Sequence, residues 1–144
     1  MSFVRVGSHV TWFLPKPWRW VDDQGHVWHD AGAEANGEGE YASGLPIETP
    51  GIALPNQNGT LGGWWHVLMP RQNIEMVVRQ VDVGPLKPVI DLSAPLAHLL
   101  FTVPDNVPDY TPWSAEFLGH SLPDGTKSGI TNTKTKTFVP LEAA

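Results

Sequence analysis

Two runs of strand-forming residues near the middle of the chain give its clearest pattern. Residues Trp64–Met69 and Ile74–Asp82 are rich in Trp, Val, Ile and Met, and only Pro70–Asn73 separates them. Tryptophan and β-branched residues favour strands, and a short connection between two strands favours an antiparallel pair. The pattern predicts a β-hairpin over these residues.

A third apolar run, Val89–Ser93, ends in a helix signal. The hydroxyl of Ser93 can accept a hydrogen bond from the first turn, and Pro95 suits that turn because its missing N–H is not needed there. We therefore expect a short helix over residues 93–100. Three leucines should face the core at helical spacing, Leu96, Leu99 and Leu100.

The flanking segments predict an opening strand or pair of strands, an insertion and a C-terminal strand. Residues 3–14 have strand character, and residues 18–40 predict an inserted hairpin with its turn at Asp22–Gly25, followed by an exposed acidic loop. Residues 130–144 alternate Thr with Asn and Lys before Phe138. This segment predicts either an edge strand blunted by lysines or an extended arm that pairs with a neighbouring subunit.

Composition narrows the class of protein. The 144 residues fit one domain, and 14 glycines and 14 prolines between short apolar runs favour a β-rich fold. A net charge of −6 makes nucleic acid and anionic membranes poor partners, and no run reaches transmembrane length. With no cysteine, disulfides and thiolate metal sites are excluded. The amino terminus predicts no signal peptide of its own.

Two aspartates are the strongest candidates for chemistry. Asp82 and Asp91 end two separate strands, and Gly84 and Pro85 force a change of direction between them. Two carboxylates in one desolvated cleft can retain a proton near neutral pH, which glycan cleavage requires. The helix that follows Asp91 should instead lower its pKa. Alternatively, both aspartates cap backbone N–H groups.

The order of these motifs resembles a known family. Asp82–Pro85, followed by Ile90–Ser93 and a helix, is similar to the signature of the double-psi β-barrels of rare lipoprotein A, and more loosely of expansins and the lytic transglycosylase A group. Tyr41–Gly44 resembles the opening of that domain, and Leu61–Val67 lies where the family has a Gly-rich approach to a strand. The resemblance spans roughly residues 41–102.

The resemblance implies an all-β fold, a six-stranded double-psi β-barrel with one short helix and an N-terminal hairpin insertion. It also implies peptidoglycan as partner and a lytic transglycosylase-like cleavage, with Asp91 as acid/base and Asp82 beside it. The chain departs from the family pattern after Ser43-Gly44. Leu45 replaces one glutamate, Glu48 replaces an aspartate, and the family histidine has no counterpart. The candidate catalytic residues are therefore Asp91, Asp82 and Glu48.

Aromatic side chains suggest where a sugar could stack. Alternation along the strand places Trp64 and His66 on one face and Trp65 on the other, so one tryptophan should be core and the other exposed. The outward one is the expected platform. The candidate substrate-binding residues are Trp64, Trp65, Ser43 and His66.

Other features leave alternatives open. Trp18, Trp20 and Trp28 can form a protein–protein patch, which the tail over residues 130–144 would extend. The segment His26–Asp30 offers two imidazoles and a carboxylate, but its spacing favours a solvated loop, so no metal or cofactor is predicted.

Three functions follow from this pattern: a glycan-cleaving enzyme, a non-catalytic cell-wall-binding module, and a structural phage tail or virion component. Because no export signal is expected, a phage or prophage particle or a secretion system would carry the protein. It would reside in the virion or cytoplasm before it reaches the cell envelope.

Overall fold

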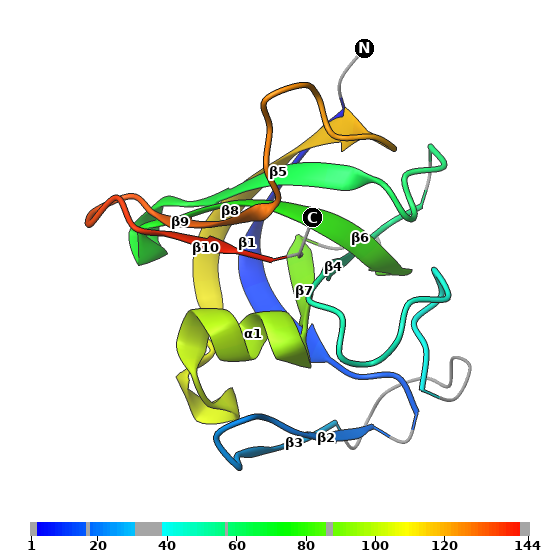
Figure 1. Ribbon diagram of the computed structural model, residues 1–144, viewed down its shortest axis with the longest axis vertical. Coiled ribbons are helices and arrows are strands. Elements are labelled where there is room, and N and C mark those ends of the chain that lie inside the picture. Colours follow the sequence, from blue (N-terminus) through cyan, green and yellow to red (C-terminus); the bar gives the residue numbers. More distant parts are fainter. Residues whose placement is uncertain (1–2, 17, 31–38, 57, 86–87, 142–144) are drawn as a thin grey trace.

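The computed structural model describes residues 3–16, 18–30, 39–56, 58–85 and 88–141. Six strands form a closed barrel, in the order β6–β4–β7–β1–β8–β5, and β5 pairs again with β6 (Figure 1). The predicted all-β, six-stranded barrel with one short helix is confirmed. The barrel strands are β1 (Val4–Phe13), β4 (Ile52–Leu54), β5 (Trp64–Met69), β6 (Ile74–Val83), β7 (Val89–Ser93) and β8 (Tyr110–Gly119).

The directions in which the barrel strands pair give the topology of the barrel. The pairs β1–β7 and β4–β6 are parallel, and the other four pairs of the ring are antiparallel. Exchanging β1 with β6, β4 with β7 and β5 with β8 reproduces every strand pairing of the barrel and its direction. The barrel therefore consists of two interlocked halves of three strands each, the double-psi arrangement.

The barrel interior is packed by alternating residues of the long strands. On β6, the side chains at every second position from Ile74 to Gln80 are buried, while those between them are partly exposed. The predicted hairpin of β5 and β6 is confirmed, with the short 3-10 helix η1 (Pro70–Gln72) in its connection. Large buried side chains of the core include Trp65, Met69, Met76, Ile90, Leu92 and Leu96.

One polar side chain, Gln80, lies at the centre of this core. Its Oε1 accepts hydrogen bonds from Thr60 Oγ1 (2.8 Å) and Trp65 Nε1 (3.0 Å). Its Nε2 donates to the carbonyl oxygens of Leu54 (2.7 Å) and Asp82 (3.2 Å). Gln80 thus ties β4 to β6 next to one of the candidate aspartates.

Helix α1 (Ala94–Phe101) begins as the sequence predicts, with the Ser93 hydroxyl accepting a hydrogen bond from the Leu96 N–H at 3.4 Å. Leu96 is buried and Leu100 is partly buried, but Leu99 is 48% exposed, so its predicted core position is wrong. The buried residues of α1 all lie in its first half, and Leu100 and Phe101 of its second half pack against the core while staying partly exposed. A second 3-10 helix, η2 (Pro104–Asn106), follows.

The predicted inserted hairpin forms from β2 (Arg19–Val21) and β3 (Val27–His29), and it lies beside α1 at one end of the molecule (Figure 1). Trp28 is completely buried and packs against Trp12, with ring centroids 5.2 Å apart. It therefore cannot contribute to the docking patch expected from the three hairpin tryptophans. Most of the predicted acidic loop, residues 31–38, lies outside the described residues.

The C-terminal segment is a hairpin, which corrects the single strand or arm expected over residues 130–144. Strand β9 (Gly129–Asn132) pairs with β6, and β10 (Phe138–Pro140) folds back onto β9. The chain reverses because Asn132 Oδ1 accepts hydrogen bonds from two backbone N–H groups of the turn and Lys136 has a φ of 65°. Among the described helices, none combines the length and apolar character needed to span a membrane.

Candidate functional site

The two candidate aspartates flank the same residue of the barrel wall. Ala53 on β4 is the register partner of Asp82 on β6 and of Asp91 on β7. An irregularity in the β4–β6 register, between Ile52 and Ala53, produces this alignment. Two strand spacings place the Cα atoms of the aspartates roughly 10 Å apart. Their side chains are close enough for the charge of Asp82 to affect the titration of Asp91.

Asp82 is held by backbone hydrogen bonds and is only 3% exposed. Its Oδ1 accepts a bond from the Val83 N–H at 2.8 Å, and the Ala42 N–H also bonds to its carboxylate. Burial raises the pKa of Asp82, and these two hydrogen bonds only partly oppose that shift. Asp82 therefore caps backbone N–H groups, as the alternative interpretation of the sequence expected. Its carboxyl is also easier to protonate than usual, because its pKa is raised.

The segment around Ser43 covers this part of β6. The Ser43 N–H donates to the Val81 carbonyl at 3.1 Å, which places Ser43 beside Asp82. Tyr41 is buried next to it, and its hydroxyl donates to the Ile47 carbonyl at 2.8 Å. Burial raises the pKa of Tyr41, a hydrogen bond with Ser93 opposes this, and the charges of Asp82 and Glu48 raise it further. Glu48 itself is exposed on the same segment.

Asp91 is only partly buried, yet it has a strongly shifted pKa. Burial is the largest cause, the negative charges of Asp30 and Asp82 add to it, and the pKa rises to about 6. The expectation that the following helix lowers this pKa is wrong. Two nearby carboxylates and the loss of water outweigh the partial charge of a helix that begins three residues later.

Asp30 is the third carboxylate of the site, and sequence reasoning missed its role. It lies just after β3, where its Oδ2 accepts a hydrogen bond from the Leu14 N–H at 3.2 Å. It also lines a pocket of about 370 Å³ together with Thr11, the register partner of Asp91 on β1. No local pattern reveals this neighbourhood, because it depends on how the inserted hairpin returns to β1.

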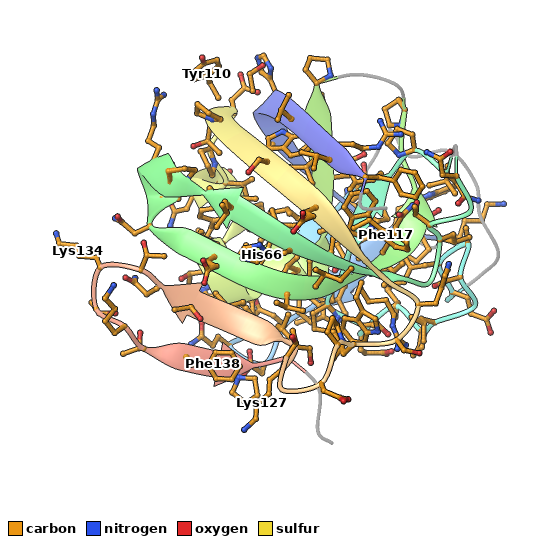
Figure 2. All side chains as sticks on the ribbon, turned by 90° about the horizontal axis from the view of Figure 1, so that it is seen from above. His66, Tyr110, Phe117, Lys127, Lys134 and Phe138 are labelled. Atoms are coloured by element: carbon orange, nitrogen blue, oxygen red, sulfur yellow. The ribbon has the colours of Figure 1, made fainter. Side chains whose placement is uncertain are left out.

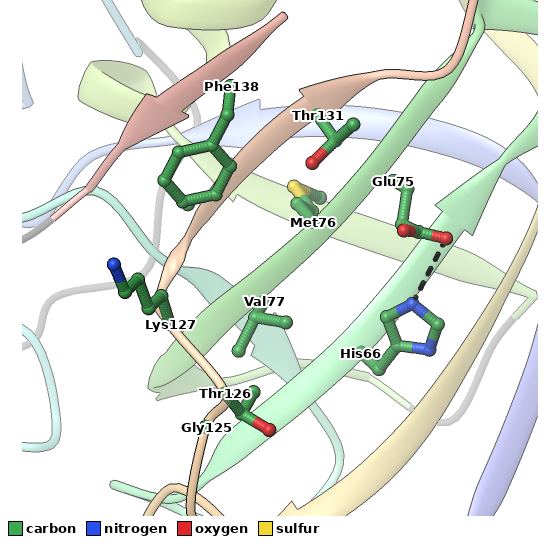
Figure 3. Close-up of a pocket in the computed structure, with 10 residues that line it drawn as sticks. His66, Glu75, Met76, Val77, Gly125, Thr126, Lys127, Thr131 and Phe138 are labelled. Atoms are coloured by element: carbon green, nitrogen blue, oxygen red, sulfur yellow. Dashed lines mark ion pairs between the residues drawn. The ribbon is translucent and has the colours of Figure 1, made fainter. Parts of the chain in front are cut away.

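His66 lies in a different pocket, on the outer face of β5 and β6. Its Nε2 is 3.5 Å from Glu75 Oε2, in a hollow of about 350 Å³ that Lys127 and Phe138 also line (Figure 3). Figure 2 shows His66 on the barrel wall, facing the side on which the C-terminal hairpin carries Phe138. His66 pairs with Val77 on β6, which is five residues before Asp82. The rise of the strand therefore places His66 roughly 16 Å from Asp82. The structure does not bring His66 to the aspartates.

Both Trp64 and Trp65 are buried, so the predicted exposed stacking platform is not present at this pair. Trp65 points into the barrel and bonds to Gln80. Trp64 faces the other way, but the guanidinium of Arg79, its cross-strand partner, lies 4.5 Å from its ring centroid. The sequence correctly predicted that the two tryptophans face opposite sides of the strand, but it did not predict that Arg79 covers the outer ring.

The site that the fold assembles is therefore a group of three carboxylates, Asp30, Asp82 and Asp91, with the Tyr41–Ser43 segment across one side. Asp82 and Asp91 come from consecutive strands, and Asp30 follows the inserted hairpin. Asp30 and Asp91 are both partly open to solvent, whereas Asp82 is buried. Comparisons with protein-family models, with curated proteins and with solved structures find no match to this chain.

Proposed function

We propose that the protein binds a glycan strand of peptidoglycan and cleaves it in the manner of a lytic transglycosylase, with Asp91 as the acid. One observation carries the proposal. Asp91 is partly open to solvent, while burial and the charges of Asp30 and Asp82 raise its pKa to about 6. Such a carboxyl is partly protonated near neutral pH and can protonate a leaving glycosidic oxygen.

In this proposal Asp91 acts twice. Its proton goes to the glycosidic oxygen as the carbon–oxygen bond breaks, and the resulting carboxylate takes a proton from the hydroxyl that attacks the sugar carbon. Asp82 is a positioning residue, because it is buried and acts through its charge on Asp91. The motif resemblance to the lytic transglycosylase A group supports the same role for Asp91. A phage particle or secretion system would deliver the protein to the wall.

A zymogram on purified peptidoglycan tests the proposal. We expect the parent protein to clear the gel, and Asp91→Asn to lose at least about 100-fold in activity, the usual contribution of a general acid. The matched control is Asp105→Asn, because Asp105 is an exposed carboxylate on η2, and this variant should keep full activity. Parent activity should also fall as pH rises through about 6. Clearing that survives Asp91→Asn would refute the assignment.

Retention on insoluble peptidoglycan separates cleavage from binding alone. A parent that is retained without clearing the gel would support the non-catalytic cell-wall module instead. A parent that is neither retained nor active would favour a structural role in a virion. Asp91→Asn should still be retained if Asp91 serves the chemical step, because neutralising one carboxyl leaves the rest of the wall-binding surface unchanged.

A further inference from the structure

Helix α1 meets the turn of the N-terminal hairpin at a cluster of histidine and aspartate side chains. His98 Nδ1 lies 3.0 Å from Asp22 Oδ2, and His98 Nε2 lies 2.8 Å from Asp23 Oδ1. His26 Nδ1 approaches the same Asp22 Oδ2 to 3.2 Å. Figure 1 shows the hairpin lying alongside α1, so this cluster connects two segments that are far apart in the sequence.

The carboxylate of Asp22 is oriented by its surroundings. Its Oδ1 accepts hydrogen bonds from the backbone N–H groups of Gln24 and His26, both at 2.9 Å. Its Oδ2 accepts a bond from Trp28 Nε1 at 3.0 Å, and the side chain is fully buried. These bonds determine which oxygen faces the two imidazoles. Partners that orient a ligand in this way are typical of metal sites.

Three atoms of the cluster have the spacing of metal ligands. Asp22, His26 and His98 each offer one ligand atom, and these three atoms all lie within 4.8 Å of one another. Ligands of a tetrahedral zinc ion are about 3.3 Å apart, because Zn–N and Zn–O bonds measure about 2.0–2.1 Å. The distances from Asp22 Oδ2 to His26 Nδ1 (3.2 Å) and to His98 Nδ1 (3.0 Å) are close to this value. His98 also donates its Nε2–H to Asp23, as metal-bound histidines usually do to a carboxylate.

We propose that Asp22, His26 and His98 bind one Zn²⁺ ion, which fastens the inserted hairpin to α1. With three protein ligands, the fourth position is left to water. The partial exposure of His26 gives the ion a path from solvent. This site is separate from the proposed catalytic carboxylates and does not depend on them.

A proton competes with zinc at His98. Its Nδ1 lies 2.7 Å from the Thr102 carbonyl oxygen as well as 3.0 Å from Asp22. Both neighbours are acceptors, so Nδ1 carries a proton when no metal is bound. Zinc must replace that proton, which is released to solvent.

The sequence offered a different set of ligands. The segment His26–Asp30 contains two histidines and one aspartate, but the structure places Asp30 near Asp91 and leaves His29 exposed. Only His26 joins the cluster, and its partners come from the turn and from α1. This difference provides the control for the experiment, because His29→Gln removes a histidine of the same hairpin from outside the cluster.

Isothermal titration of the full-length, tag-free protein with ZnCl₂ tests the proposal. We expect one saturable site per chain, weakened at least tenfold in His98→Gln and in Asp22→Asn and unchanged in His29→Gln. His26→Gln is the variant that should fold normally, because its side chain is 38% exposed, and it should also weaken binding. Absence of a one-to-one zinc site in the parent, or parent-like affinity in both His26→Gln and His98→Gln, would overturn the proposal.

Discussion

At the residue scale, the environment of Asp91 decides its chemistry more than its neighbours in sequence do. The sequence places it before a helix start, which favours a low pKa. In the fold it is partly buried, and the charges of Asp30 and Asp82 are close, so the pKa is raised to about 6. A carboxyl that is costly to ionise in the folded state is a feature of catalytic acids, and it lowers stability.

Replacing Asp91 with asparagine should stabilise the protein at pH 7. The folded pKa of about 6 exceeds the ordinary value of 3.8, so the parent loses stability as pH rises from about 4 to 6. With one pKa unit equal to about 1.4 kcal/mol, and allowing for partial exposure, we expect Asp91→Asn to gain about 2 kcal/mol at pH 7.

Urea unfolding of parent and variant at pH 4 and pH 7 measures this difference. It should be large at pH 7 and nearly absent at pH 4, where Asp91 is protonated in the folded state. Asp105→Asn, which changes an exposed carboxylate, should leave the free energy of unfolding within about 0.5 kcal/mol of the parent. Equal stability of Asp91→Asn and parent at pH 7 would contradict the raised pKa.

At the element scale, local patterns were sufficient where the sequence carries its own boundary signals. The β5–β6 hairpin, the start of α1 at Ser93 and the inserted hairpin were all predicted from such signals. The C-terminal hairpin was not, because its turn depends on Asn132 and on a positive φ at Lys136. In a segment rich in Thr and Lys, asparagine and lysine predict a turn less strongly than glycine does.

Gln80 should be essential for the junction of β4 and β6. Substitution by leucine removes the hydrogen-bond partners of Thr60, Trp65, Leu54 and Asp82 in a buried region. Leaving such groups unsatisfied costs about 1–3 kcal/mol each, so we expect Gln80→Leu to destabilise the fold by at least about 3 kcal/mol. Chemical denaturation, with Gln24→Leu at an exposed turn position as control, measures the loss. A change below about 1 kcal/mol would show that the junction does not depend on this side chain.

At the scale of the whole molecule, barrel closure creates the candidate site. The motif around Asp82 and Asp91 predicted that these two residues belong together, and both align with Ala53 on β4. The third carboxylate, Asp30, arrives from the inserted hairpin, and His66 is carried to a separate pocket on the outer wall. Those placements depend on strand order and on the return path of an insertion, which residue patterns within one segment do not encode.

Carboxyl-carbon NMR titration of Asp91 is the most direct measurement of this coupling. In the parent we expect Asp91 to titrate near pH 6, and its pKa should fall in Asp30→Asn and in Asp82→Asn, because each substitution removes a neighbouring negative charge. Asp105→Asn should leave it unchanged. A parent Asp91 that titrates near 4, or a pKa that neither substitution lowers, would contradict a shared carboxylate site and the catalytic role proposed for it.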